Sequence, residues 1–498
     1  MARIAVIGAG AAGLAVAIRL AAARHEVTVY EQGPAAGGKL ATYRRDGFAF
    51  DTGPSLLTLP AVYRDLFLNT GAALEDCVDL QAVEPAFSYR FADGTGVVVP
   101  GVGVTRAAQA FAEAFGGSAG DDWTRLMERA ARMWQLTREP FIESPLRGWR
   151  TLLSLASSLS DVRTVAPRTS LRSLGQQYLA DPRLRQVLDR YATYTGSDPR
   201  RAPAVLATVP YVEQAFGAWH LGGGLGTLAD AMAARCQQLG VDIRLDCDVT
   251  GIALADGRAC GVELVDGSVA PADVVVANAD ASQVYGGLID NEAARAAARD
   301  LRKSTPSLAG FVLLLAVRGT TSGIAHHNVW FPSDYDAEFD DIFGARPRPV
   351  RDPAIYACVP ADAGMRPDDS SESWFVLVNA PRHSDGGQQP GTVDWKAPGL
   401  ADTYATHVLD LLAARGTDLR DRIIWKETRT PADLEASVRA PGGAIYGTSS
   451  NGARAAFQRP ANASPVPGLY LVGGSAHPGG GLPLVGISAN IVADLIGR

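Results

Sequence analysis

The sequence contains few cysteines, and their arrangement argues against both a disulfide framework and a metal site. Its 498 residues include five cysteines, an odd number with no CxxC spacing. We therefore expect neither a disulfide framework nor a metal site, and free thiols suit a reducing cytoplasm. The five are Cys77, Cys236, Cys247, Cys260 and Cys358.

Long apolar runs are also missing. The nearest approach to one, Gly310 to Val317, is far shorter than the roughly 20 residues that a membrane-spanning helix needs. The first predicted strand begins at Arg3, which leaves no space for the charged and apolar regions of a signal peptide. We therefore expect a cytoplasmic protein that is not integral to a membrane but can lie on the inner face of the cell membrane.

A strong charge of either sign is absent as well. The chain has 46 basic and 53 acidic residues, for a formal net charge of −7. Such a balance does not attract nucleic acid, so we expect no nucleic-acid partner. The length allows two or three domains with a large core.

What the sequence does contain is a glycine-rich beginning. From Arg3 onward it reads as a short apolar strand, a GxGxxG turn at Gly8, Gly10 and Gly13, an alanine-rich helix and a second strand that ends at Glu31. Backbone N–H groups of such a turn can approach a pyrophosphate, and the acid can accept hydrogen bonds from a ribose hydroxyl. This pattern predicts a dinucleotide-binding βαβ unit, and the acid disfavours NADP.

A second glycine turn follows the first unit. The residues GGKL at Gly37 to Leu40 precede GFAFDTGPSLLTLP, which runs from Gly47 to Pro60. This arrangement resembles the flavoprotein family that contains amine oxidases and phytoene desaturases. The resemblance implies that the cofactor is FAD, with the second turn continuing along its diphosphate and ribityl chain.

The C-terminal stretch carries a third glycine turn. GLYLVGGSAHPGGGLPLVGISANIVADLIGR, from Gly468 to Arg498, reads as a buried strand, a dense glycine turn and a terminal helix. The N-terminus of that helix would stabilise negative charge on a reduced flavin. Together with WHLGGGLGTLADAM from Trp219, these motifs resemble carotenoid desaturases of the bacterial phytoene desaturase type over nearly the whole chain.

The resemblance implies a set of residues that contact FAD. They lie in the glycine turns, at the ends of the adjoining strands and beside the adenine. They are Gly8, Gly10, Ala11, Ala12, Gly13, Glu31, Gln32, Gly37, Gly38, Lys39, Leu40, Gly53, Pro54, Ser55, Leu56, Val249, Asn278, Gly473, Gly474, Leu482, Leu484 and Val485.

The expected fold is α/β, with a Rossmann-like FAD-binding domain that is discontinuous in the sequence, a substrate domain with a mixed sheet, and a helical cap. We assign residues 1–100, 218–285 and 431–498 to the FAD-binding domain. Residues 101–217 form the cap and residues 286–430 the substrate domain.

By the same resemblance the substrate is a long acyclic carotenoid or related isoprenoid, desaturated by hydride transfer to flavin N5, with oxygen or a quinone as electron acceptor. Such a substrate needs an apolar tunnel. Trp219, Trp330 and Phe331 are candidates for its walls, although each is also a reasonable core residue. His477, beside the third glycine turn, is a candidate acid–base group or a residue that holds the loop.

Two further stretches carry hypotheses. Pro145 to Val165 combines Trp149 and several leucines with arginines, which suits either a helix lying in a membrane surface or one packed on its own domain. His326 and His327 are adjacent on a predicted strand. Neighbouring side chains on a strand point to opposite faces, so we expect no metal site there.

Other functions fit the same scaffold. A redox-neutral carotene isomerase or an oxygenase of terminal groups would use the same cofactor site. An FAD amine oxidase would need an aromatic cage that the sequence does not reveal. A prenyl-lipid carrier without flavin is disfavoured by the intact glycines and Glu31. The sequence leaves the particular carotenoid, the number of desaturation steps and the oligomeric state open.

Overall fold

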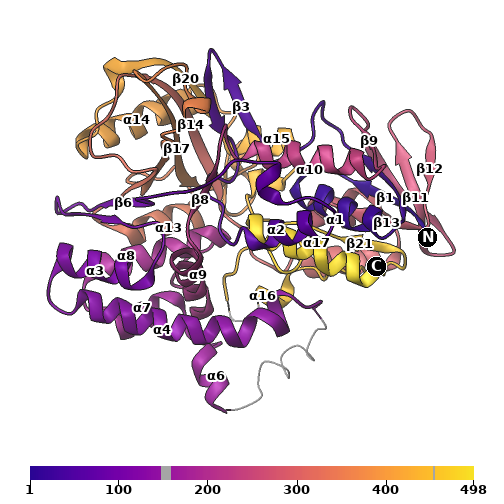
Figure 1. Ribbon diagram of the computed structural model, residues 1–498, viewed down its shortest axis with the longest axis horizontal. Coiled ribbons are helices and arrows are strands. Elements are labelled where there is room, and N and C mark those ends of the chain that lie inside the picture. Colours follow the sequence, from indigo (N-terminus) through magenta and orange to yellow (C-terminus); the bar gives the residue numbers. More distant parts are fainter. Residues whose placement is uncertain (147–158, 453–454, 498) are drawn as a thin grey trace.

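A computed structural model describes residues 1–146, 159–452 and 455–497. Residues 147–158, which hold most of the hypothesised membrane-surface segment with Trp149, lie outside the described residues. The parallel sheet and the larger mixed sheet lie at opposite ends of the long axis, and the helical layer lies beneath the mixed sheet (Figure 1). Among the helices of the described residues, none combines the length and apolar character needed to cross a membrane.

The glycine-rich beginning forms the centre of a five-stranded parallel sheet. Its strand order is β21-β13-β1-β2-β9, and every neighbouring pair is parallel. The strands are β1 (Arg3–Ile7), β2 (Glu26–Tyr30), β9 (Asp242–Arg244), β13 (Val274–Ala277) and β21 (Leu469–Leu471). Segments from the start, middle and end of the chain therefore share one sheet, as the sequence predicts.

Both faces of this sheet are covered. On one face, α1 (Ala11–Ala22), α10 (Gly226–Gln238), α17 (Leu482–Ile496) and α2 (Ala61–Leu68) pack into one apolar cluster with β1 and β2. On the other face, the antiparallel strands β10 (Val249–Ala255), β11 (Arg258–Leu264) and β12 (Val269–Pro271) pack together with α11 (Ala281–Gln283) and α12 (Glu292–Leu301). Burial on both faces explains why residues 4–7 of β1 and all of β13 are apolar.

The second sheet has seven strands in the order β20-β14-β17-β16-β15-β6-β7. All neighbouring pairs are antiparallel except β15 with β6. The sequence predicts four strands of a second sheet, and the structure confirms them: Phe311–Val317, Asn328–Phe331, Ile355–Val359 and Trp374–Asn379. It also predicts a hairpin of Phe87–Phe91 with Gly96–Pro100, within the residues 1–100 assigned to the FAD-binding domain. The structure confirms the hairpin as β6 and β7 but adds it to the second sheet. The strands are β6 (Phe87–Arg90), β7 (Gly96–Val99), β14 (Ala309–Arg318), β15 (His327–Trp330), β16 (Ile355–Cys358), β17 (Ser371–Ala380) and β20 (Ile423–Arg429).

A layer of helices lies under one face of the second sheet (Figure 1). Phe111, Trp123 and Met127 are buried there in one apolar cluster with Phe87 of β6. The sequence spacing of Trp123, Met127, Trp134 and Leu136 predicts an apolar helix face, and the burial of Trp123 and Met127 agrees with it. The indole of Trp123 donates a hydrogen bond to Gln214 (3.0 Å). The helices are α3 (Val104–Phe115), α4 (Ala119–Thr137), α6 (Leu159–Val165), α7 (Leu171–Tyr178), α8 (Pro182–Arg190) and α9 (Thr208–Phe216).

Shorter elements complete the fold. The opposite face of the second sheet is covered by α14 (Leu400–Ala414), whose Tyr404 packs on Phe311. The remaining elements are β3 (Thr42–Arg45), β4 (Phe48–Asp51), β5 (Leu80–Ala82), β8 (Trp219–Leu221), α13 (Tyr335–Phe343), β18 (Arg382–His383), β19 (Thr392–Val393), α15 (Pro431–Val438) and α16 (Ala455–Gln458).

Candidate active site

The three glycine turns meet at the carboxyl end of β1. The Gly37 N–H donates to the Ala9 carbonyl (2.8 Å), which joins the second turn to the first. Asn278, just after β13, accepts a hydrogen bond from the Gly13 N–H (3.1 Å) and donates one to the Val472 carbonyl (3.2 Å). This asparagine side chain therefore joins the first turn to the third.

Close backbone approach explains why glycine occupies these positions. A Cβ added to Gly13 would lie 2.1 Å from the Gly8 carbonyl oxygen, and one added to Gly53 would lie 1.8 Å from the Lys39 carbonyl oxygen. Gly8 and Gly473 have φ values of +91° and +106°, which L-residues rarely adopt. Since the N-terminus of α1 begins beside these turns, its free N–H groups suit a diphosphate.

Glu31 has the geometry expected of a ribose ligand. One carboxylate oxygen accepts from the Ala9 N–H (2.7 Å) and the other from the Gly33 N–H (2.9 Å). Each oxygen keeps acceptor capacity for a ribose hydroxyl. The Cys247 N–H donates to the Glu31 carbonyl (2.8 Å), which brings the start of β10 and Val249 beside it. The amide of the neighbouring Gln32 donates to the Ser437 carbonyl (3.3 Å).

Lys39 is buried, and its ammonium group donates to the Ile445 carbonyl (2.9 Å). Burial lowers its pKa, and nearby Asp280 offsets part of that shift. The lysine therefore joins the second turn to the loop before the third.

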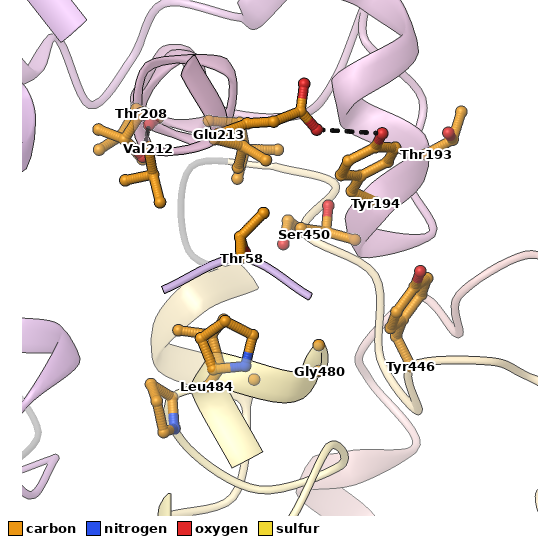
Figure 2. A pocket seen from close by; sticks show the side chains of 18 of the residues that line it. Thr58, Thr193, Tyr194, Thr208, Val212, Glu213, Tyr446, Ser450, Gly480 and Leu484 are labelled. Atoms are coloured by element: carbon orange, nitrogen blue, oxygen red, sulfur yellow. Dashed lines mark hydrogen bonds between the residues drawn. The ribbon is translucent and has the colours of Figure 1, made fainter. Parts of the chain in front are cut away.

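A large cavity opens beside the turns. Its volume is about 650 Å³, and its wall comes from the helical layer, the second sheet and the third glycine turn. Figure 2 shows part of the wall, with Gly480 and Leu484 on one side and Glu213 with Tyr194 on the other. Six of the expected FAD-binding residues also line it: Gly53, Pro54, Ser55, Leu56, Leu482 and Leu484.

The wall of this cavity is mostly apolar. Among the described residues that line it, the charged types are represented by Arg190, Glu213 and Arg459. The Arg459 guanidinium donates to the carbonyls of Tyr446 (3.0 Å), Thr448 (2.7 Å) and Gly474, and burial lowers its pKa to about 10. A cation supported by carbonyl oxygens at the glycine turn favours negative charge nearby.

His477 lies under the third turn, outside the described cavity wall. Its Nε2 lies 2.8 Å from the Phe141 carbonyl oxygen and 3.0 Å from that of Ser144, so this nitrogen carries the proton. Burial lowers the pKa of the ring to about 4. A neutral imidazole that holds two carbonyls joins the glycine turn to the end of the helical layer, which suits the loop-holding interpretation.

Trp219, Trp330 and Phe331 are not among the residues that line the cavity, which corrects the expectation that they form its walls. Trp330 packs against Trp374 on the other face of the second sheet, while its neighbour Val329 faces the cavity. Phe331 stacks on Phe91, and the Trp219 indole donates to the Phe216 carbonyl (2.9 Å). Successive side chains of β15 point to opposite faces of the sheet, so Val329 faces the cavity and Trp330 faces away from it.

The rings of His326 and His327 lie together, so the expectation that they point to opposite faces of a strand is wrong, because His326 precedes β15. Their ring centroids are 4.6 Å apart, and ligating atoms of both rings and of Cys358 lie within 4.8 Å of one another. Burial lowers the pKa of His326 to about 3, and it also lowers that of His327, whose Nδ1 is 2.8 Å from the Tyr356 hydroxyl. The absence of a metal stays a prediction.

The residues that sequence reasoning missed are Arg190, Tyr194, Glu213 and Arg459. Each stands alone in its local sequence, without a motif or a recognisable spacing. Arg190 lies at the end of α8 and Glu213 lies within α9, so only the packing of these helices brings them to one cavity.

The fold and the converging glycine turns define a flavin-dependent oxidoreductase. The family profile described as "Flavin containing amine oxidoreductase" matches residues 11–327. The chain belongs to this family, and its cofactor is FAD.

Individual relatives agree with this assignment over full length. A 4,4'-diapolycopene oxygenase of Methylomonas sp is 34% identical over 499 residues, covering 99% of this chain and 98% of that protein. A hydroxyneurosporene desaturase of Rubrivivax gelatinosus is 33% identical, covering 99% and 93%. The crystal structure of an oxidoreductase from Methanosarcina mazei has a TM-score of 0.67 at 16% identity, covering 99% of this chain and 100% of that one, which supports the fold.

Proposed function

We propose that this protein is an FAD-dependent desaturase of a long acyclic carotenoid. The observation that carries the proposal is the cavity of about 650 Å³, mostly apolar, that ends on the third glycine turn. A polyene offers few polar groups, so its binding depends on buried apolar area at about 2.5 kcal/mol per 100 Å². The two relatives named above support the substrate class, since both act on carotenoids by name.

The wall suits a reaction that depends on positioning. When bound, FAD would supply a hydride acceptor at flavin N5, and the proton from the neighbouring carbon would pass to water. The positive charge that develops spreads over an allylic system, so correct placement of the C–H bond matters more than a strong base. The charged side chains among the described residues that line the cavity are Arg190, Glu213 and Arg459. Arg459 and the N-terminus of α17 would stabilise negative charge at the glycine turn.

The direct experiment is to incubate the FAD-loaded protein with acyclic carotenes in liposomes and to identify the products by chromatography and mass spectrometry. A product two hydrogens lighter than its substrate supports desaturation. Val209→Trp, which would fill part of the cavity, should retain FAD and lose turnover. Val269→Trp, at an exposed position of β12 that is not among the residues lining the cavity, is the matched control. Equal turnover in both variants would contradict a cavity that holds the substrate.

An oxygenase remains the second candidate, because the 34% identical relative is named as one. The same incubation separates the two, since an oxygenase adds oxygen to the product mass and an isomerase changes only its chromatographic retention. An amine oxidase is disfavoured by the cavity, whose described wall is mostly apolar and carries two guanidinium groups, Arg190 and Arg459, against one carboxyl group, Glu213. Flavin absorbance of the purified protein tests the carrier alternative.

We also propose that the substrate arrives from a membrane, on the inner face of the cell membrane, and that oxygen or a quinone takes up the electrons. The cavity is lined by apolar residues on both sides of residues 147–158, namely Phe141, Ile142, Val162 and Val165. The Val162 side chain is 37% exposed. An apolar opening at this place would give a hydrocarbon a path that avoids water. In a flotation experiment, the intact protein should float with the liposomes, whereas a Trp149→Glu, Leu152→Glu variant should not. Equal flotation of both proteins would contradict membrane contact.

The electron acceptor is tested separately. The reduced enzyme is mixed with oxygen or with a quinone, and the compound that oxidises the flavin is the acceptor.

A further inference from the structure

We propose that Arg190, Tyr194 and Glu213 form a polar subsite that binds a hydroxyl group at the end of the carotenoid. This inference rests on the proposed function and narrows it to hydroxylated acyclic carotenoids. All three residues line the cavity, although most of its wall is apolar. We call these three residues the Arg190 cluster.

Arg190 is a buried cation with an unusual set of neighbours. Its side chain lies over the rings of Phe87 (5.4 Å), Tyr194 (5.0 Å) and Tyr356 (5.3 Å), and one of its amino groups donates to the Tyr194 hydroxyl (2.9 Å). The residue is 6% exposed, its described side-chain hydrogen bond goes to a tyrosine hydroxyl, and its charge acts on the nearby Glu213, whose pKa it lowers. A buried guanidinium that is held by aromatic rings and a neutral hydroxyl would be stabilised further by a polar ligand group in this mostly apolar cavity.

Glu213 supplies the complementary acceptor. It is 4% exposed and accepts hydrogen bonds from the Tyr191 hydroxyl (2.5 Å) and, more weakly, from that of Tyr194 (3.4 Å). Its carboxyl group retains lone pairs for a further donor. Burial raises its pKa to about 7, with the two tyrosines and Arg190 opposing that shift.

The Arg190 cluster is separated from the glycine turn. Figure 2 shows the Glu213 carboxylate and the Tyr194 hydroxyl directed toward one another, with Thr58 between them and Gly480. A long ligand could therefore place its end in the cluster and a bond further along the chain beside the flavin. The cluster would set which bond of the polyene lies at the reacting position.

The chemistry of the cluster selects a neutral hydroxyl. A hydroxyl group can donate a hydrogen bond to Glu213 and accept one from Arg190 or Tyr194, so it serves the acceptor and the donors of the cluster at the same time. An ammonium end would be repelled by Arg190, and above about pH 7, where Glu213 is ionised, a carboxylate end would be repelled by Glu213. A plain hydrocarbon would leave the buried polar groups without a ligand, and sites built on such groups discriminate strongly against analogues that lack the hydroxyl.

The test compares two substrates that differ by one hydroxyl. A monohydroxylated acyclic carotenoid and its parent hydrocarbon are supplied in liposomes to the FAD-loaded enzyme, and kcat/KM is measured for each. We expect the hydroxylated substrate to be preferred at least about tenfold. Tyr194→Phe and Glu213→Gln, both of nearly unchanged size, should each lower this preference at least about threefold. Tyr211→Phe, which removes a hydroxyl from the same helix α9 outside the cavity wall, should preserve it.

A preference below twofold in the unmodified enzyme would overturn the subsite, and so would a preference that survives both substitutions. Equilibrium binding of the two compounds is measured in parallel, together with FAD content as a control for folding. The unmodified enzyme could bind the hydroxylated compound preferentially, lose that preference in Tyr194→Phe, and turn over neither compound. This result would support the subsite and contradict the proposed desaturase activity. If the enzyme shows no turnover and no preferential binding, both the subsite and the proposed desaturase activity are overturned.

Discussion

Replacing Gly13 by alanine should remove FAD from the protein. The added Cβ would lie 2.1 Å from the Gly8 carbonyl oxygen and 3.0 Å from Asn278 Oδ1. Because an ordinary carbon–oxygen contact is about 3.3 Å, the start of α1 would have to move by about 1 Å. The movement would also break the hydrogen bond from the Gly13 N–H to Asn278.

The magnitude follows from these two effects. Overpacking against rigid backbone costs up to about 3 kcal/mol, and this strain falls at the turn where the diphosphate is expected. A loss of about 3 kcal/mol in binding corresponds to a Kd for FAD that is roughly 100-fold higher. We therefore expect Gly13→Ala to purify largely without flavin while keeping its secondary structure.

The assay is calorimetric titration of the apoprotein with FAD, combined with flavin absorbance of the protein as purified. Gly286→Ala is the matched control, since a Cβ at Gly286 meets nothing within 4 Å and its φ is not left-handed. We expect this control to bind FAD like the unmodified protein. A Kd for Gly13→Ala within about threefold of the control would refute the convergence of the glycine turns on the cofactor.

Three further predictions concern single side chains. Glu31→Gln replaces an acceptor of two backbone N–H groups with a side chain that has one acceptor oxygen, so the Kd for FAD should rise about tenfold in the same titration. His477→Gln should lower the melting temperature but leave the pH profile of kcat unchanged, whereas loss of an ionisation from that profile would establish a role in proton transfer. Glu213 is protonated in the folded state up to about pH 7 but ionises near its ordinary pKa when unfolded, so stability from this group is lost as pH rises through that window. Between pH 5 and pH 8 the unmodified protein should therefore lose roughly 3 kcal/mol relative to Glu213→Gln in denaturant titrations, and parallel curves would contradict the raised pKa.

Much of the fold could be predicted because its signals are local. Gly8, Gly10 and Gly13 between two apolar runs predict a βαβ unit, and the structure places this unit at the centre of the parallel sheet. Strands of the second sheet could be predicted because they are short apolar runs between turns. The hairpin of β6 and β7 was predicted as a hairpin, but its sheet was not, because pairing with β15 depends on contacts more than 200 residues away.

The cavity wall could be predicted only in part. Gly53, Ser55 and Leu482 belong to motifs and therefore stand out in the sequence. Trp330 attracted notice by its size, yet the register of β15 turns it away and presents Val329 instead. Which face of a strand is directed to a cavity depends on what covers each face, and that information is not local.

The most direct test of the account mixes the FAD-loaded protein, without oxygen, with an acyclic carotenoid in liposomes while flavin absorbance is followed. The account predicts that the oxidised flavin band disappears as a product with one more double bond forms in equal amount. A flavin that stays oxidised while the carotenoid occupies the cavity would contradict it.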